Sequence, residues 1–391
     1  MSPRHNFELA TEWVGITHTE TTHGQETYGY VEPNRVALEG VRFLPKNRPS
    51  ATLIMYMHPT ATISRLPVPR AMAAAGMHVL CAESRYTRND TALIMEKVLL
   101  DFGAFVRHAK ENWGYEKVVL AGWSGGGSLT SYFQSQAENP TLVDTPAGDP
   151  IDLGQLVGGD GVVFHAAHLS RADMLADFID PSVIDEANPD IRNPEFDLYD
   201  PRNPEKPPYS TEYLQNFRAE QKARVRRRTV YVKEMLEQLR SRGGKETDRV
   251  ILTQRTMADP RCLDPAVDPN DRVPGTSLMG DPEAANVNPA GIARYSTLRS
   301  WLSQWSFDDS RARADVAAAN ITVPVLVIEN SADHVVPQPH SERFYAACAS
   351  KDKTFFAAEG ADHYYSGDNG MLDTVVDKTL EWMMSRNLLA D

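Results

Sequence analysis

The sequence predicts an α/β protein with a mostly parallel, doubly wound sheet and an inserted helical cap. Short apolar runs, typical of strands covered on both faces, alternate along the chain with segments of helical periodicity. Between about residues 170 and 313 this alternation stops, Pro and Asp become frequent, and strand signals nearly disappear. The alternation then resumes. We therefore expect a core in two parts, 1–169 and 314–391, with the cap at 170–313 between them.

The chain begins with a segment typical of a sheet edge. Residues 11–44 alternate polar and apolar side chains, and Gly24 and the pair Pro33 and Asn34 supply turns. We expect an antiparallel strand pair or meander here, because such alternation indicates strands with one face in solvent.

The elements that follow alternate strictly between strand and helix. In chain order they are expected at 51–57 (strand), up to 75 (helix), 77–82 (strand), 91–112 (helix), 118–121 (strand), 129–138 (helix) and 161–164 (strand). Such an alternation builds a parallel sheet with helices on both faces. Ligands of these sheets bind at the carboxyl ends of the strands, where His58, Glu83 and Ser124 fall.

Helical spacing of apolar residues and short apolar runs also predict the elements of the cap and of the second part of the core. Helices are expected in the cap at about 211–242 and 292–305, followed by strands at 323–329 and 354–358 and a last helix at about 371–386. Four arginines lie together on the first of these helices, where we expect a solvated or ion-paired face rather than an anion site: Arg224, Arg226, Arg227 and Arg228.

Composition and charge restrict the classes of partner. The chain has 391 residues and a net charge of −13, which argues against nucleic acid and an anionic membrane surface. Its three cysteines are odd in number and far apart, so neither a disulfide framework nor a metal pattern is expected, and a reducing, cytoplasmic location fits. The N-terminus lacks a signal-like apolar stretch, and no run approaches the roughly 20 apolar residues of a membrane span. We expect a small-molecule substrate as partner, and the oligomeric state stays open, a homodimer included.

One short stretch carries the strongest chemical signal. Residues 122–126, Gly-Trp-Ser-Gly-Gly, fit the pattern G-x-S-x-G between a predicted strand and a predicted helix. A serine there must sit in a tight turn to raise its hydroxyl above the strand ends, and the glycines leave room where a Cβ would meet a neighbouring strand or helix. The following helix points its free N–H groups at the same place. A phosphate-binding turn or a closely packed turn would also fit this pattern.

Three motifs together resemble the α/β-hydrolase family. They are the glycine-rich turn at 122–126, the strand and loop at 324–337, and the Gly-Ala-Asp-His stretch at 360–363. The resemblance covers about residues 30–165 and 315–391. It implies an α/β-hydrolase fold, with a nucleophile, an acid and a base in the chain order that this family uses.

The resemblance assigns roles to three residues: Ser124 as the nucleophile, Asp333 as the acid and His363 as the base. A serine hydroxyl is a poor nucleophile at neutral pH, so the histidine must take its proton during attack, and the acid must hold the imidazole in the right tautomer. Glu329 stays an alternative acid. Two other histidines that follow the same strand stay alternative bases: His334 and His340.

An oxyanion needs two N–H donors. Gly125 directly follows the nucleophile and is expected to supply one. Relatives often take the other from a loop that begins with His-Gly, but here His58 is followed by Pro59, which has no N–H. The second donor is therefore expected at Thr60 or Ala61.

Further residues are candidates for contacts with the substrate because they lie at strand ends, beside the nucleophile, or among the aromatics of the cap. They are His58, Trp123, His165, His168, Trp301 and Trp305. Ordinary packing is the competing interpretation for these side chains. No cofactor and no metal is expected, because serine chemistry needs neither and no metal-ligand motif is present.

The expected activity is hydrolysis of a carboxylic ester, or a related acyl bond, of a small to medium organic substrate. Relatives that open epoxides or displace halide carry a carboxylate nucleophile, so the serine here implies acyl transfer to water. The same residues would also serve hydrolysis of a carbon–carbon bond next to a ketone, or acyl transfer to an alcohol, and thioesters and amides are further alternatives. Outside enzymology, the alternative is a ligand-binding protein on a hydrolase scaffold.

Overall fold

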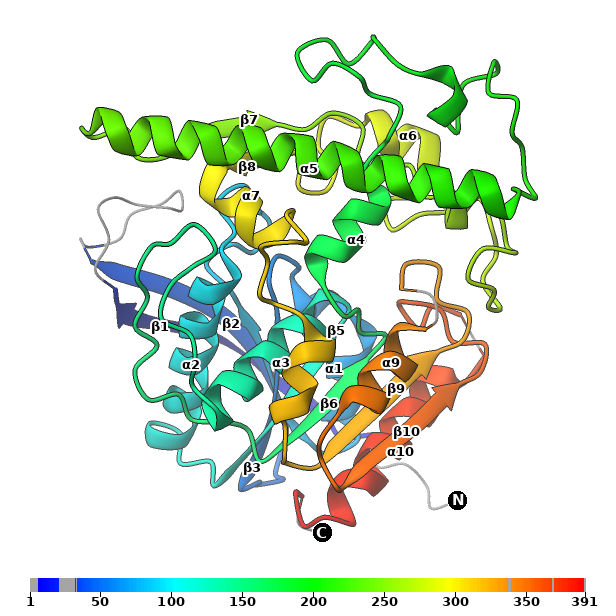
Figure 1. The fold of residues 1–391 in the computed structure, drawn as a ribbon. Helices are drawn as coiled ribbons and strands as arrows, with labels where there is room; N and C mark the ends of the chain where they lie inside the picture. Colours follow the sequence, from blue (N-terminus) through cyan, green and yellow to red (C-terminus); the bar gives the residue numbers. More distant parts are fainter. Residues whose placement is uncertain (1–5, 21–31, 33, 337–338, 368, 390–391) are drawn as a thin grey trace.

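The computed structural model describes residues 6–20, 32, 34–336, 339–367 and 369–389 (Figure 1). The expected turns at Gly24 and Pro33 lie outside the described residues. The core is an eight-stranded sheet with the strand order β1-β2-β4-β3-β5-β6-β9-β10. The strands are β1 (Leu9–Thr19), β2 (Arg35–Pro45), β3 (Thr52–His58), β4 (His78–Glu83), β5 (Lys117–Trp123), β6 (Gly161–His165), β9 (Val325–Asn330) and β10 (Lys353–Ala358).

The direction of the strands follows the sequence pattern. β1 pairs antiparallel with β2, and β2 antiparallel with β4, whereas all pairs from β4 to β10 are parallel. Within the part of 11–44 that the structure describes, β1 and β2 thus form the antiparallel edge that the alternation predicts. The apolar runs form parallel strands because the helices between them carry the chain back across the sheet.

Helices cover both faces of this sheet (Figure 1). They are α1 (Pro67–Ala74), α2 (Met95–Glu111), α3 (Gly125–Glu138), α8 (Ala314–Ala317), α9 (His340–Ala347) and α10 (Met371–Met384). On β3, Leu53 and Met55 face the core shared with α2, α3, α8 and α9. Ile54 and Tyr56 face the opposite core, shared with α1 and α10. Successive side chains of a strand point to opposite faces, so one apolar run supplies both cores.

A long insertion lies between β6 and β9. It holds α4 (Arg171–Phe178), α5 (Thr211–Arg242), α6 (Pro282–Val287), α7 (Leu298–Gln304) and the two-stranded pair β7 (Val250–Leu252) and β8 (Tyr295–Thr297). Short 3-10 turns complete the fold: η1 (Ile63–Arg65), η2 (Pro194–Phe196), η3 (Pro260–Cys262) and η4 (Ala318–Asn320). Figure 1 shows α5 lying across the top of the molecule, above the sheet.

The insertion differs from the prediction in one helix. A helix was expected at 292–305, but the chain first forms the short strand β8 and α7 begins only at Leu298. Thr297 explains this start, because its Oγ1 accepts the N–H of Ser300 at 3.1 Å and so caps the helix. On α5, Arg224 and Arg228 are buried and ion-paired with Glu186. Arg226 and Arg227 are exposed and ion-paired with Asp308 and Glu220, so the expected solvated or ion-paired face is confirmed.

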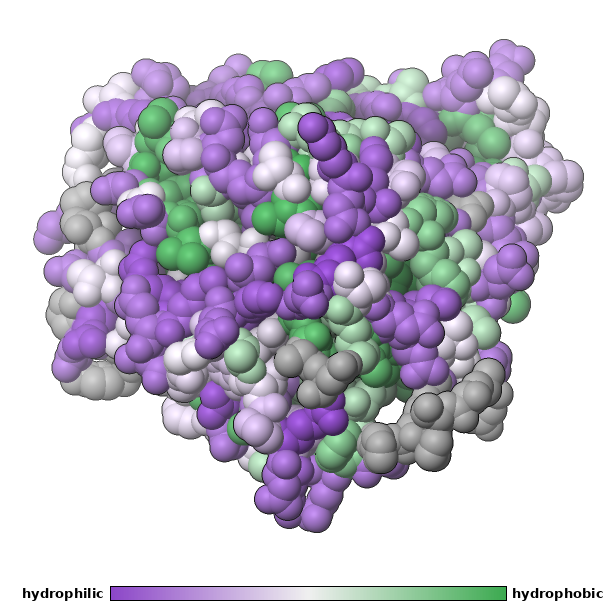
Figure 2. Space-filling view, turned by 90° about the horizontal axis from the view of Figure 1, so that it is seen from below, coloured by the Kyte–Doolittle hydropathy of each residue, from purple (hydrophilic) through white to green (hydrophobic). Residues whose placement is uncertain are grey.

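The lower face of the molecule is mostly polar. Seen from below, it is largely hydrophilic, with apolar areas between the polar side chains (Figure 2). Within the described ranges, no helix has an apolar stretch long enough to cross a bilayer. The three cysteines, Cys81, Cys262 and Cys348, are buried as free thiols.

Candidate active site

The order and direction of these strands are those of the α/β-hydrolase fold, so the expected fold class is confirmed. At the centre of the sheet β5 ends at Trp123 and α3 begins at Gly125, which leaves Ser124 alone in the turn between them. Ser124 has φ 53° and ψ −122°. A positive φ is costly for a residue with a side chain, and such strain is kept where a fold holds a functional group in place.

The glycines around Ser124 are required by contact with backbone. A Cβ on Gly122 would lie 2.5 Å from the carbonyl oxygen of Gly126. A Cβ on Gly126 would lie 2.6 Å from the carbonyl oxygen of Met57 on the neighbouring strand β3. Both distances are too short for any side chain, so the G-x-S-x-G pattern reflects the close packing of α3 on β3 and β5, as the sequence predicts.

His363 and Asp333 form a buried hydrogen-bonded pair. The Nδ1 of His363 lies 2.8 Å from Oδ2 of Asp333, and each side chain is 1% exposed. The other oxygen, Oδ1, accepts the N–H groups of Val335 and Val336, both at 2.7 Å. Three hydrogen bonds therefore fix this carboxylate as an acceptor. Because this carboxylate oxygen accepts a hydrogen bond from Nδ1–H, the second ring nitrogen of the neutral imidazole, Nε2, carries the lone pair. The expected alternatives do not take this position: Glu329 lies earlier, on β9 itself, and the His334 ring packs against that of His363 at 6.4 Å.

The loop of His363 is attached to the loop of Ser124. Trp123, the residue before the serine, donates its Nε1–H to the carbonyl oxygen of His363 at 2.9 Å. The two rings lie with centroids 4.6 Å apart, and Tyr364 packs against both. The sheet thus brings together Ser124 at the end of β5 and the Asp333–His363 pair that follows β9 and β10.

A residue of the insertion supports the acid loop. Asn270 donates its Nδ2–H to the carbonyl oxygen of Asp333 at 2.7 Å, and the N–H of Asp271 bonds the carbonyl oxygen of Ser331 at 2.9 Å. Sequence reasoning missed Asn270, since an Asn in an Asp-Pro-rich stretch predicts only a turn. Nothing in the local pattern links it to a residue 63 positions later.

Both residues that were predicted to supply the second oxyanion donor have their N–H groups bonded to a side chain. The N–H of Thr60 bonds Nδ1 of His58 at 3.0 Å, and the N–H of Ala61 bonds the same nitrogen at 2.8 Å. Both donors are therefore occupied by a side chain two and three residues earlier. Gly125, the first predicted donor, is the first residue of α3, so its N–H has no acceptor within the helix.

Two buried histidines flank Gly125. A Cβ on this glycine would lie 2.7 Å from Nε2 of His58 and 3.1 Å from Nε2 of His168. Burial lowers the pKa of His58 to about 3, with the positive charge of Arg171 as the next cause. Burial also lowers the pKa of His168 well below its ordinary value. Both imidazoles are therefore uncharged at neutral pH, and both lie beside the nucleophile turn as the sequence suggests.

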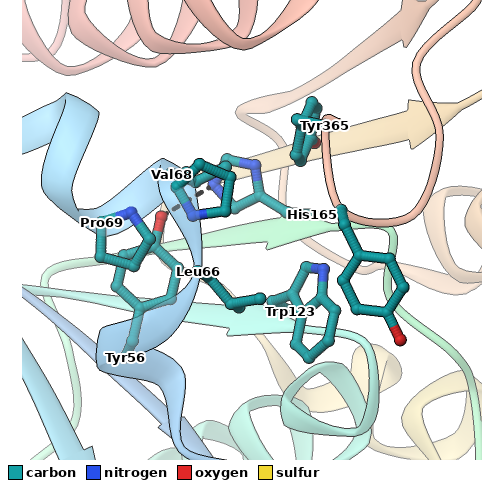
Figure 3. A pocket seen from close by; sticks show the side chains of 9 residues that line it. Tyr56, Leu66, Val68, Pro69, Trp123, His165 and Tyr365 are labelled. Carbon is teal, nitrogen blue, oxygen red and sulfur yellow. Dashed lines mark hydrogen bonds between the residues drawn. The ribbon is translucent and has the colours of Figure 1, made fainter. Parts of the chain in front are cut away.

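His165 lies on the other side of the sheet. Its Nε2 is 3.2 Å from the hydroxyl of Tyr56, and its ring is fully buried (Figure 3). Figure 3 shows it at a small, mainly apolar pocket lined by Tyr56, Leu66, Pro67, Val68, Pro69, Trp123, His165, Tyr364 and Tyr365. Successive side chains on β6 alternate between faces, so His165 is directed away from the face that α3 covers. His165 lines this pocket together with Trp123, its register partner on β5, and the expected substrate contact at His165 stays a prediction.

The two tryptophans of the insertion are also packing residues. Trp301 and Trp305 are 0% exposed and stack on each other with ring centroids 5.0 Å apart. Each Nε1–H has a partner inside the insertion, the hydroxyl of Thr229 and the carbonyl oxygen of Ala293. The expected substrate contacts of Trp301 and Trp305 are therefore wrong, because both rings form the core under α5.

A family model described as Hydrolase_4, serine aminopeptidase S33, matches residues 304–369, a stretch that holds Asp333 and His363 but not Ser124. A search of the curated proteins finds no match.

Several solved structures align with most of the chain. They include a monoacylglycerol lipase of Paleococcus ferrophilus, at 15% identity over 89% of this chain and 98% of that chain, with a TM-score of 0.46. Est1E of Butyrivibrio proteoclasticus has 14% identity over 90% and 94%, with a TM-score of 0.46. DcsB in complex with its substrate analogue has 13% identity over 96% and 99%, with a TM-score of 0.49. At such values the fold assignment rests on the strand order, and function must be inferred from the residues of the site.

Proposed function

We propose that the protein is a serine hydrolase that cleaves a carboxylic ester through an acyl-enzyme, with Ser124, His363 and Asp333 as nucleophile, base and acid. One observation supports this most strongly. A strained serine directly precedes the helix α3, and the residue before it is bonded to the loop of a histidine whose Nδ1 is held by a buried carboxylate. Strain at Ser124 and burial of an ion-pairing carboxylate both cost stability, and catalysis gives them a common purpose.

The reaction follows from the proton positions. Asp333 holds the proton on Nδ1 of His363, so Nε2 takes the proton of the Ser124 hydroxyl as Oγ forms its bond to the carbonyl carbon. The carbonyl electron pair moves onto oxygen, at the N-terminal end of α3. When the intermediate collapses, the bond to the alcohol breaks and His363 returns the proton to the alcohol oxygen. Water then repeats the two steps on the acyl-serine.

The surroundings of the serine favour a substrate with a small acyl group. Ser124 is 8% exposed, and the flanking side chains of His58, His168 and Trp123 are each 7% exposed. An ester carbonyl that reaches Oγ must therefore fit among these rings. A small acyl group with a larger alcohol directed outward fits this arrangement better than a long acyl chain.

Turnover of p-nitrophenyl esters from acetate to octanoate tests the proposal. We expect hydrolysis with a preference for the short acyl chains, and a loss of several orders of magnitude in Ser124→Ala at nearly unchanged thermal stability. No turnover of any ester would favour carbon–carbon bond hydrolysis or acyl transfer instead. Full activity of Ser124→Ala would exclude the proposed nucleophile.

Cleavage of an amide is the second candidate. The description of the matched family, serine aminopeptidase, favours it for the stretch that carries Asp333 and His363. Aminoacyl p-nitroanilides test it directly: turnover of these amides faster than of the matching esters would place amides first.

The non-enzymatic alternative is a ligand-binding protein on the same scaffold. A fluorophosphonate probe separates the two, because only an activated serine attacks phosphorus at a useful rate. We expect stoichiometric labelling of Ser124, and folded protein without labelling would favour a binding protein.

A further inference from the structure

Neither backbone donor that was expected in the loop after β3 is free to bind an oxyanion. Pro59 has no N–H, and the N–H groups of Thr60 and Ala61 both bond Nδ1 of His58. The core fixes this conformation from outside: the hydroxyl of Ser84 donates to the carbonyl oxygen of Pro59 at 2.6 Å, and the N–H of Arg88 donates to that of Thr60 at 2.7 Å. The two amides are therefore held on the His58 ring.

These two bonds decide the tautomer of His58. A ring nitrogen that accepts two N–H groups carries no proton, so the proton of the neutral imidazole lies on Nε2. Burial keeps the ring neutral, since it lowers the pKa of His58 to about 3. His58 therefore presents a single, fixed N–H donor at the far end of its ring.

That donor lies beside the first oxyanion donor. Nε2 of His58 would be 2.7 Å from a Cβ on Gly125, and a Cβ lies about 2.5 Å from the nitrogen of its own residue. Nε2 is thus within about 5 Å of the Gly125 nitrogen, a separation that one oxygen can bridge with two hydrogen bonds of about 2.9 Å. Glycine is needed at position 125 for the same reason, because a methyl group would collide with the imidazole.

Within the described residues Nε2 of His58 donates to no protein acceptor. The fully enclosed nitrogens without a partner include Nδ1 of His165 and of His168 but not Nε2 of His58, so this nitrogen is not fully enclosed. His168 is the nearest rival donor, at 3.1 Å from the same position. Its Nδ1 has no partner, so no hydrogen bond to that nitrogen fixes its tautomer as the two amides fix that of His58.

We propose that the Nε2–H of His58 is the second oxyanion donor and replaces the backbone N–H that Thr60 or Ala61 was expected to supply. The inference rests on the proposed function of Ser124. His58 keeps its proton throughout: it donates a hydrogen bond to the carbonyl oxygen as the negative charge develops there, while the proton of Ser124 travels through His363. His58 is therefore a catalytic residue without being the acid or the base.

The replacement His58→Ala in the full chain distinguishes a His58 donor from a backbone donor, because the two predict opposite changes in kcat. If His58 is the donor, kcat for p-nitrophenyl acetate falls by about 10²–10³ while KM changes little. If the amides of Thr60 or Ala61 are the donors, the replacement frees them, and kcat stays level or rises, which would overturn the proposal. His108→Ala, on α2 against Trp113 and away from the site, is the matched control and should stay within twofold of wild type.

A second readout does not need ester turnover. The rate of Ser124 phosphonylation by a fluorophosphonate should fall in His58→Ala by a factor similar to that for kcat, because the phosphoryl oxygen occupies the same place. If wild type is labelled but hydrolyses no ester, the ester function fails while the labelling ratio still decides on His58. An unchanged labelling rate in folded His58→Ala contradicts the proposal. Wild type that neither turns over esters nor reacts with the probe overturns both.

A measurement on wild-type protein removes the dependence on folding of the variant. With ¹⁵N-labelled histidine, a trifluoromethyl ketone that forms an anionic hemiketal on Ser124 should move the Nε2–H proton of His58 downfield, coupled to its own nitrogen. His58→Gln, which keeps an N–H donor, should recover part of the activity lost in His58→Ala. A resonance of His58 that does not move in the adduct, or a moved resonance that belongs to His168, would overturn the assignment.

Discussion

Replacing Asp333 by Asn gives a prediction whose direction follows from three hydrogen bonds. Oδ1 of Asp333 accepts two backbone N–H groups at 2.7 Å, and Oδ2 accepts Nδ1–H of His363 at 2.8 Å. An asparagine has one oxygen and one NH₂ group for these two places. With the oxygen toward the backbone, the NH₂ group faces His363. The flipped amide would leave the N–H groups of Val335 and Val336 without acceptors, at a cost of roughly 1–3 kcal/mol each.

The two backbone N–H groups therefore favour the amide orientation that prevents catalysis in Asp333→Asn. The NH₂ group facing Nδ1 forces the proton of His363 onto Nε2, and the ring loses the lone pair that must accept the proton of Ser124. We expect kcat to fall by about 10⁴, equivalent to about 5 kcal/mol of transition-state stabilisation, with little change in KM.

The assay compares kcat for p-nitrophenyl acetate, per folded protein, in Asp333→Asn, Asp333→Ala and the control Glu329→Gln. The first should keep near-normal thermal stability, whereas Asp333→Ala should melt earlier because it leaves both N–H groups buried without an acceptor. Glu329→Gln should lose little activity once corrected for folded fraction. A loss of less than tenfold in Asp333→Asn would refute the reasoning, and a large loss in Glu329→Gln alone would make Glu329 the acid.

Three further outcomes are expected. Gly126→Ala should lower the melting temperature and should lower kcat more than tenfold, because the new Cβ would lie 2.6 Å from the carbonyl oxygen of Met57. A variant with normal activity would contradict this packing. Trp301→Ala should reduce the free energy of unfolding by about 3–5 kcal/mol, measured by urea denaturation, with KM unchanged, and a raised KM at full stability would instead make the ring a substrate contact. Burial lowers the pKa of His58 and His165 to about 3, against about 6.5 in the unfolded chain. Between about pH 6.5 and 3 the unfolded state therefore binds more protons than the folded state. Each of these two histidines should lower the free energy of unfolding by about 1.4 kcal/mol per pH unit as pH falls through this range. Urea midpoints that stay constant between pH 7 and 5 would contradict neutral buried rings.

The sheet and the reactive turn could be predicted because both depend on short-range patterns. A run such as residues 51–57 must form a strand covered on both faces, and glycines around Ser124 are needed wherever a helix and a strand approach so closely. The pairing of His363 with Asp333 was implied by the resemblance to the α/β-hydrolase family, and in the structure the two follow neighbouring parallel strands.

The sequence does not predict which of several possible partners a backbone N–H group or an aromatic ring contacts in the folded protein. The sequence shows that Thr60 and Ala61 have N–H groups, but not that the ring of His58 folds back to accept both. It shows an aromatic at 301 and another at 305, but both a pocket and a core are compatible with that spacing, and the long helix α5 decides for the core. Contacts across long separations, such as that of Asn270 with Asp333, leave no local signal.

Trapping the covalent intermediate tests the central claim most directly. Protein mixed with p-nitrophenyl acetate, quenched in acid within milliseconds and digested should carry one acetyl group on the peptide that contains Ser124, at a level that rises with the burst of p-nitrophenol. The acetyl group should be absent in His363→Ala. Turnover without an acetylated Ser124, or acetyl groups on another residue formed at the rate of turnover, would contradict the account.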